Sequence, residues 1–170
     1  LEFVEQKQAE GLGHSIYQAE PIARGEGLFI ALGDMLFENG YDTFLEAHDL
    51  LPVADGSIGV KRVDEPSHYG VVEKNGGGEI TQLVEKPDDP PSNFAISGVY
   101  VIEDSDSLFD ALDYLIRNDV RGAGDEYQLT DALERMIQNG DTLRTFEVED
   151  WYDCGRPDTL LEANRVLLKR

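Results

Sequence analysis

Short apolar runs alternate with amphipathic stretches along this 170-residue chain, and that alternation restricts the fold more than any other feature. The run Leu-Phe-Ile-Ala-Leu at residues 28–32 predicts a strand buried on both sides of a parallel sheet. Strands that alternate with helices indicate an α/β fold with helices on both faces. We expect strands at residues 1–5, 28–32, 56–63, 71–74, 80–86, 95–102 and 143–148, and helices at residues 11–20, 41–51, 107–118, 129–139 and 157–168.

Glycines and prolines mark several of the expected boundaries. Gly140 follows the helix at residues 129–139 as a C-terminal cap, and Pro157 suits the first turn of the last helix. The stretch Asn-Gly-Gly-Gly at residues 75–78 predicts a hairpin turn. It is not a phosphate-binding loop, because no helix follows it.

The chain is strongly acidic, with 35 acidic and 14 basic residues and a net charge of −21. Such a field repels phosphate backbones and anionic lipid surfaces, so nucleic-acid and membrane partners are disfavoured. The chain is nevertheless expected to fold, because 47 of its residues are Leu, Ile, Val or Phe. The composition, with Arg more frequent than Lys, is typical of proteins from high-salt organisms. An unusually acidic mesophilic protein is the alternative.

The single cysteine, Cys154, excludes an internal disulfide and favours the reducing cytoplasm. No apolar run is long enough to span a membrane, and no signal segment opens the chain. The chain starts at Leu1 within an expected strand, so we expect an upstream part to be missing. Cys154 itself is interpreted as a small buried residue and not as a nucleophile.

Two aspartates are the strongest candidates for chemistry. Asp34 follows the expected strand at residues 28–32, at the edge where open α/β sheets bind ligands. Asp153 lies in Trp-Tyr-Asp-Cys-Gly, directly before the last helix. Each alone is more often a cap or turn residue. If the fold brings them together, they form an oxygen site suited to Mg²⁺, which takes one or two carboxylates plus substrate phosphates.

Two further features accompany the aspartates. Lys86 precedes a rigid loop with three prolines, which favours phosphate binding, although an edge-strand lysine that prevents aggregation is the plainer interpretation. Gly70 permits close approach of a ligand to the backbone, or simply a turn. The three histidines, His14, His48 and His68, are not spaced like the ligands of a zinc site.

Taken in order, these pieces resemble the sugar-1-phosphate nucleotidyltransferases, most closely the glucose-1-phosphate thymidylyl- and uridylyltransferases. The matching stretches cover nearly the whole chain and stand at residues 6–14, 32–34, 69–73, 84–87, 97–100, 126–131 and 151–155. Seven motifs in family order make coincidence improbable, although none is specific alone. The resemblance implies a Rossmann-like mixed sheet of the nucleotide-diphospho-sugar transferase type.

The resemblance also implies the reaction and its residues. A sugar-1-phosphate oxygen attacks the α-phosphorus of a nucleoside triphosphate and pyrophosphate leaves, a transfer that depends on positioning and charge neutralisation. Asp34 and Asp153 would hold Mg²⁺, and Lys86 would contact the sugar phosphate. The remaining implied contacts are base recognition by Gln6 and Gly11, and sugar binding by Tyr69, Gly70, Glu85, Ile96, Gly98, Tyr100 and Thr130. A homo-oligomer is also expected.

The sequence departs from the family pattern in two places. The family's glycine-rich Gly-x-Gly-x-Arg loop is absent, so residues 1–170 are expected to be a partial catalytic domain, truncated at its N-terminus. Relatives also carry an arginine where Gly124 and Asp125 stand here, and the nearest arginine is Arg121.

Two other functions stay open. Some relatives lack the phosphate loop and act as silent regulatory or assembly subunits. A metal-dependent glycosyltransferase is the second alternative, but such enzymes usually need an Asp-x-Asp pair, and Asp34 is followed by Met35 and Leu36.

Overall fold

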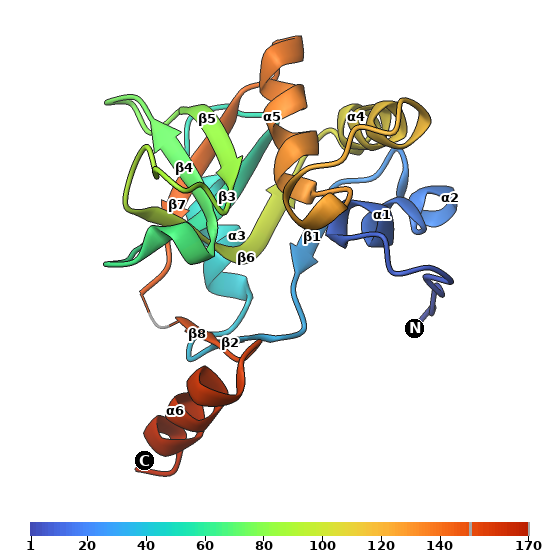
Figure 1. Cartoon of the computed structure of the whole chain (residues 1–170). Coiled ribbons are helices and arrows are strands. Elements are labelled where there is room, and N and C mark those ends of the chain that lie inside the picture. Colours follow the sequence, from blue (N-terminus) through green and yellow to red (C-terminus); the bar gives the residue numbers. More distant parts are fainter. Residues whose placement is uncertain (150, 170) are drawn as a thin grey trace.

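The computed structural model describes residues 1–149 and 151–169 of the chain (Figure 1). Its helices are α1 (Leu12–Tyr17), α2 (Glu20–Ala23), α3 (Asp42–Asp49), α4 (Ser105–Arg117), α5 (Leu129–Asn139) and α6 (Pro157–Leu167), with 3₁₀ turns at Pro66–His68 and Ala123–Asp125. Its strands are β1 (Leu28–Ala31), β2 (Met35–Phe37), β3 (Gly56–Arg62), β4 (Gly70–Lys74), β5 (Ile80–Glu85), β6 (Phe94–Ile102), β7 (Leu143–Glu147) and β8 (Trp151–Asp153).

The main sheet is mixed and is organised around β6. Its order is β5-β4-β6-β3-β7, and β1 also pairs with β6. β3 pairs along one edge of β6, whereas β4 and β1 share the other edge. β4 meets that edge at Ala95 and β1 meets it from Val99 to Ile102, so a gap separates them at the middle of β6.

Hydrophobic side chains fill both faces of this sheet. Tyr100 and Ile102 of β6 belong to a large core with residues of α1, α4 and α5, the helices grouped together in Figure 1. Val99 and Val101, which alternate with them, belong to a smaller core with Phe44 of α3. The predicted α/β class with helices on both faces is therefore confirmed.

The predicted bounds of the last four helices agree with the structure within two residues, whereas the helix predicted at residues 11–20 ends at Tyr17 and is followed by the separate helix α2. α5 has the predicted bounds, and Gly140 ends it in the left-handed conformation at φ 109°. α4 begins two residues early because the Asp104 carboxylate accepts a hydrogen bond from the Ser107 amide at 3.2 Å. Among the helices in the described ranges, none has both the length and the apolar character needed to cross a bilayer.

Two strand predictions were wrong. Residues 1–5 form no strand, and the side chains of Leu1 and Phe3 are exposed, because no described strand lies beside them. β1 is not a parallel strand buried on both sides. It pairs antiparallel with β6, and three of its four residues are only partly buried, since β6 is its one partner among the described strands.

A small sheet made by β2 and β8 was not predicted from the sequence. Each strand has three residues, too few for a periodicity to be recognised. The pairing is antiparallel and joins Met35 to Asp153. This sheet and α6 lie together at one end of the molecule (Figure 1).

Candidate active site

A cavity of about 460 Å³ lies beside the middle of β6, where the gap separates β4 from β1. The pairing of β3 with β6 is irregular at this point. Gly59 of β3 lies opposite the three residues 97–99 of β6, so β6 forms a bulge around Gly98. Gly98 has φ 83°, a conformation that glycine adopts without strain. A Cβ at this position would lie 2.8 Å from Met35 Cγ. Bulges often redirect side chains next to active sites.

The two candidate aspartates meet at one wall of this cavity. Asp34 directly precedes β2 and Asp153 ends β8, so the β2–β8 pairing sets them side by side. The Cys154 amide also donates to the Asp34 carbonyl oxygen at 2.8 Å. Asp153 Oδ1 and Asp34 Oδ2 lie 3.1 and 3.2 Å from the point where a Cβ on Gly155 would stand. Both carboxylates therefore lie close to Gly155, whose amide donates a hydrogen bond to Asp153 Oδ1 at 2.8 Å.

This pair fits the requirements of Mg²⁺. Within residues 1–149 and 151–169, no group of three or more His, Cys, Asp or Glu side chains is arranged to hold a metal ion. Mg²⁺ does not need one, because it commonly takes one or two carboxylates and fills its octahedron with water and phosphate oxygens. Asp34 and Asp153 can thus hold a metal together with an anionic ligand.

The opposite wall carries a carboxylate, a hydroxyl and an amine. Thr130, in the first turn of α5, donates a hydrogen bond to Glu85 Oε2 at 2.6 Å. The amine Nζ of Lys86 lies 3.8 Å from Glu85 Oε1. Lys86 itself has φ 43°, a left-handed conformation that is uncommon for a residue other than glycine. Its amide donates to the carbonyl oxygen of Tyr69, which holds the end of β5 against the start of β4.

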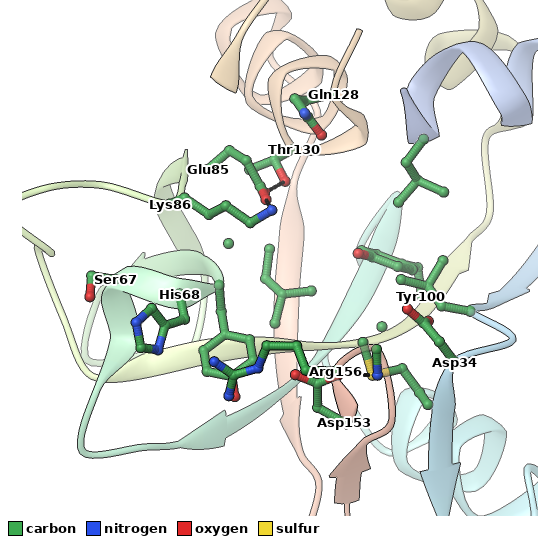
Figure 2. A pocket seen from close by; sticks show the side chains of 18 residues that line it. Asp34, Ser67, His68, Glu85, Lys86, Tyr100, Gln128, Thr130, Asp153 and Arg156 are labelled. Carbon is green, nitrogen blue, oxygen red and sulfur yellow. Dashed lines mark hydrogen bonds and ion pairs between the residues drawn. The ribbon is translucent and has the colours of Figure 1, made fainter. Parts of the chain in front are cut away.

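Two tyrosines contribute neutral hydroxyls. Tyr100 is 3% exposed, its hydroxyl points toward the cavity in Figure 2, and no described residue hydrogen-bonds to that hydroxyl. Burial, and then the negative charges of Glu85 and Asp34, raise its pKa. Burial and Asp153 likewise raise the pKa of Tyr69, against an opposing effect of Arg156. Both phenols stay protonated near neutral pH and can donate to a ligand.

The charges around the cavity are mixed, unlike the acidic surface. Asp34, Glu85 and Asp153 are negative, and Lys86 and Arg156 are positive. In Figure 2, Lys86 lies with Glu85 on one side of the pocket, while Arg156 lies beside Asp153 on the other. An anionic ligand that enters this cavity therefore meets a cation on each side.

Most of the predicted site residues line this one cavity, namely Asp34, Tyr69, Gly70, Glu85, Lys86, Ile96, Gly98, Tyr100, Thr130 and Asp153. Gln6 and Gly11 do not. The Gln6 amide donates to the Gly11 carbonyl at 3.1 Å and lies 3.0 Å from His14 Nδ1. Gly11 packs against the Tyr127 backbone, beside Leu12, which does line the cavity.

Eight further residues that line the cavity were not predicted as site residues, namely Leu12, Leu32, Met35, Ser67, His68, Gln128, Gly155 and Arg156. Seven of them stand within two positions of a predicted site residue, and Arg156 stands three positions after Asp153. This closeness in sequence was the signal that could have identified them, since a loop that positions one ligand-binding residue tends to position its neighbours too.

Gly70→Ala is expected to lower the free energy of unfolding by about 1–3 kcal/mol, the usual cost of overpacking. The new Cβ would lie 2.9 Å from both Glu85 Oε2 and Ile96 Cδ1. Chemical denaturation measures the change. The matched control is Gly76→Ala in the hairpin turn, where a Cβ meets nothing within 4 Å. Equal effects of the two substitutions would contradict the close packing at Gly70.

Comparison with known proteins adds a family assignment to this geometry. The family model described as nucleotidyl transferase matches residues 1–170. The chain is 31% identical to the low-salt glycan biosynthesis nucleotidyltransferase Agl11 of Haloferax volcanii, over 99% of this chain and 46% of that protein. It is also 31% identical to the UTP–glucose-1-phosphate uridylyltransferase AglF of the same organism, over 98% of this chain and 67% of that one.

The chain is also similar to a solved structure. The crystal structure of a UDP-glucose pyrophosphorylase complexed with UDP-glucose superposes with a TM-score of 0.77 at 29% identity, covering 99% of this chain and 66% of that one. The chain thus spans less than half the length of Agl11 and about two thirds of the other two proteins.

Proposed function

This chain belongs to the nucleotidyl transferase family, and from that premise we propose that residues 1–170 form a large part of the catalytic domain of a sugar-1-phosphate nucleotidyltransferase. The proposed reaction transfers a nucleotidyl group from UTP or dTTP to glucose 1-phosphate or a related sugar 1-phosphate. One observation carries the proposal. Asp34 and Asp153 are far apart in sequence but line the same cavity. That cavity also contains a lysine and the carboxylate and hydroxyl groups that can hydrogen-bond to a sugar.

The wall formed by β5 and α5 suits a sugar ring. Glu85 accepts the hydrogen bond of Thr130 and has a second carboxylate oxygen for ligand hydroxyls. The hydroxyl of Tyr100 is available as a donor at the same cavity. Gly70 and Gly98 line the cavity and have no side chain that could fill it, so a ring can lie against β4 and β6. These groups would orient the sugar so that its phosphate lies near Lys86.

The aspartate wall suits the reacting phosphates. We propose that Asp34 and Asp153 hold Mg²⁺, which when bound neutralises phosphate charge. Lys86 would hold the sugar phosphate so that one of its oxygens faces the α-phosphorus of the nucleotide. A new P–O bond forms there as the bond between the α-phosphorus and the bridging oxygen breaks, and pyrophosphate leaves. Base recognition by Gln6 and Gly11 remains part of the proposal.

The test combines binding and turnover. The chain is titrated with UDP-glucose and dTDP-glucose in the presence of Mg²⁺, and pyrophosphate release is then measured with UTP or dTTP and several sugar 1-phosphates, at low and at molar salt. We expect binding of at least one sugar nucleotide, and release that needs both the sugar phosphate and Mg²⁺. Absence of sugar-nucleotide binding at millimolar ligand in both salt conditions would overturn the proposal.

A further inference from the structure

We propose that Arg156 is a second phosphate-binding residue of this cavity, which acts from the side opposite Lys86 on the phosphate groups of a bound sugar phosphate or sugar nucleotide. This inference rests on the proposed function and deepens it. Arg156 stands at the N-cap position of α6, directly after Gly155 and three residues after Asp153. The segment that positions the aspartate therefore positions the arginine as well.

The guanidinium of Arg156 is available to a ligand. It lines the cavity, and its side chain is 48% exposed. Among the described residues its only ion pair is a weak one, with 4.0 Å between Nε and Asp158 Oδ1. Figure 2 shows the side chain beside Asp153, across the pocket from Lys86. Its positive charge also acts on Tyr69, which lines the cavity, because Arg156 opposes the rise in the pKa of that tyrosine.

The other arginine that the sequence brings into consideration is already occupied. Arg121 bonds to Asp119 at 2.8 Å, to Glu10 at 3.0 Å and to the Tyr127 hydroxyl at 2.9 Å. It does not line the cavity. Gly124 and Asp125 stand where relatives often carry an arginine, and neither supplies a positive charge. Among the Lys and Arg residues of the described chain, Lys86 and Arg156 alone line this cavity.

Electrostatics explain why the site needs this second cation. Asp34, Glu85 and Asp153 put three carboxylates around the cavity, and each repels an approaching phosphate. Lys86 is a compact point charge that is already 3.8 Å from Glu85. A guanidinium offers a planar fork of donors that matches two phosphate oxygens at once. On the side of the pocket where the aspartates lie, Arg156 thus supplies a positive charge and can orient the phosphate through two hydrogen bonds.

The test compares Arg156, the N-cap residue of α6, with Arg165 inside that helix. Arg156→Gln and the control Arg165→Gln each remove one positive charge, and Arg165 is exposed. Each variant and the unaltered chain are titrated with glucose 1-phosphate and with UDP-glucose by calorimetry. We expect Arg156→Gln to weaken binding about 10- to 100-fold, the range for loss of a hydrogen bond to a charged group, and Arg165→Gln to change it less than about twofold. Arg156→Lys is expected to recover part of the loss.

The two ligands distinguish the phosphate that Arg156 binds. A loss with both ligands assigns Arg156 to the sugar phosphate, and a loss with UDP-glucose alone assigns it to the phosphate next to the nucleoside. Either result supports the inference. If the unaltered chain binds these ligands and Arg156→Gln weakens them no more than Arg165→Gln, the role of Arg156 is overturned and the proposed function stands. If the unaltered chain binds neither ligand, both are overturned.

Discussion

Replacing Asp34 or Asp153 by asparagine is expected to lower the rate of nucleotidyl transfer about 10³-fold or more. An amide keeps the shape of the side chain but removes the negative charge that binds a divalent cation. A metal ion contributes several kcal/mol to such a transfer, and each 1.36 kcal/mol corresponds to a factor of ten in rate. Because Asp34 and Asp153 both lie beside Gly155 and are proposed to hold one metal ion, each single substitution should cost nearly the full effect. The measurement is pyrophosphate release as a function of Mg²⁺ concentration.

The control for this experiment is Asp89→Asn. Asp89 is exposed in the proline-rich loop, and it does not line the cavity, yet its replacement changes the net charge by the same amount. It should leave the rate unchanged. Melting temperatures of all three variants should stay near that of the unaltered chain. Rates near normal in both Asp34→Asn and Asp153→Asn would refute the metal assignment.

Trp151→Ala is expected to lower the free energy of unfolding by about 3–5 kcal/mol, the range for loss of a buried large aromatic side chain. Trp151 is 7% exposed and belongs to the smaller core. Its Nε1 donates to the Met35 sulfur at 3.1 Å, and its ring meets that of Tyr69 edge to face at 5.3 Å between centroids. These contacts anchor β8 beside β2. Without them Asp153 is no longer held beside Asp34, so binding of Mg²⁺ and nucleotide should weaken as well.

Chemical denaturation and Mg²⁺-dependent binding of UDP-glucose measure the two effects of Trp151→Ala. The matched variant Trp151→Phe keeps an aromatic ring but removes the hydrogen bond to Met35 and part of the buried indole. It is expected to cost about 1 kcal/mol and to retain binding. A loss below about 1 kcal/mol in Trp151→Ala would show that this packing does not hold the small sheet together.

Local signals predicted much of the fold because those signals are strong. The helix α5 was predicted with its observed bounds, since an apolar periodicity is followed by Gly140. The hairpin β4–β5 was recognised by the turn at residues 75–78. The predictions failed where a strand depends on its partner. Residues 1–5 have a strand-like pattern but no described neighbour, and β1 pairs antiparallel on a shared edge of β6.

Some residues of the candidate site could likewise be predicted from local motifs, and others could not. Asp34, Lys86 and Asp153 were selected from their own motifs, whereas Arg156 was not, because no spacing rule connects it to a ligand. Its place in the cavity depends on where α6 begins relative to β8. Gln6 was selected too, yet in the structure its amide bonds to Gly11 outside the cavity.

The sequence by itself determined the residue types and the order of the main elements: an acidic chain of α/β type, with Asp34 after an expected strand and Asp153 before the last helix. Only the tertiary structure decided that those aspartates meet. Their meeting depends on the pairing of two three-residue strands, β2 and β8, which comes from the packing of Trp151 and Met35 and not from any local propensity. The bulge at Gly98 likewise exists only because one residue of β3 faces three of β6. Contacts between distant segments set both features, and a local pattern contains no information about such contacts.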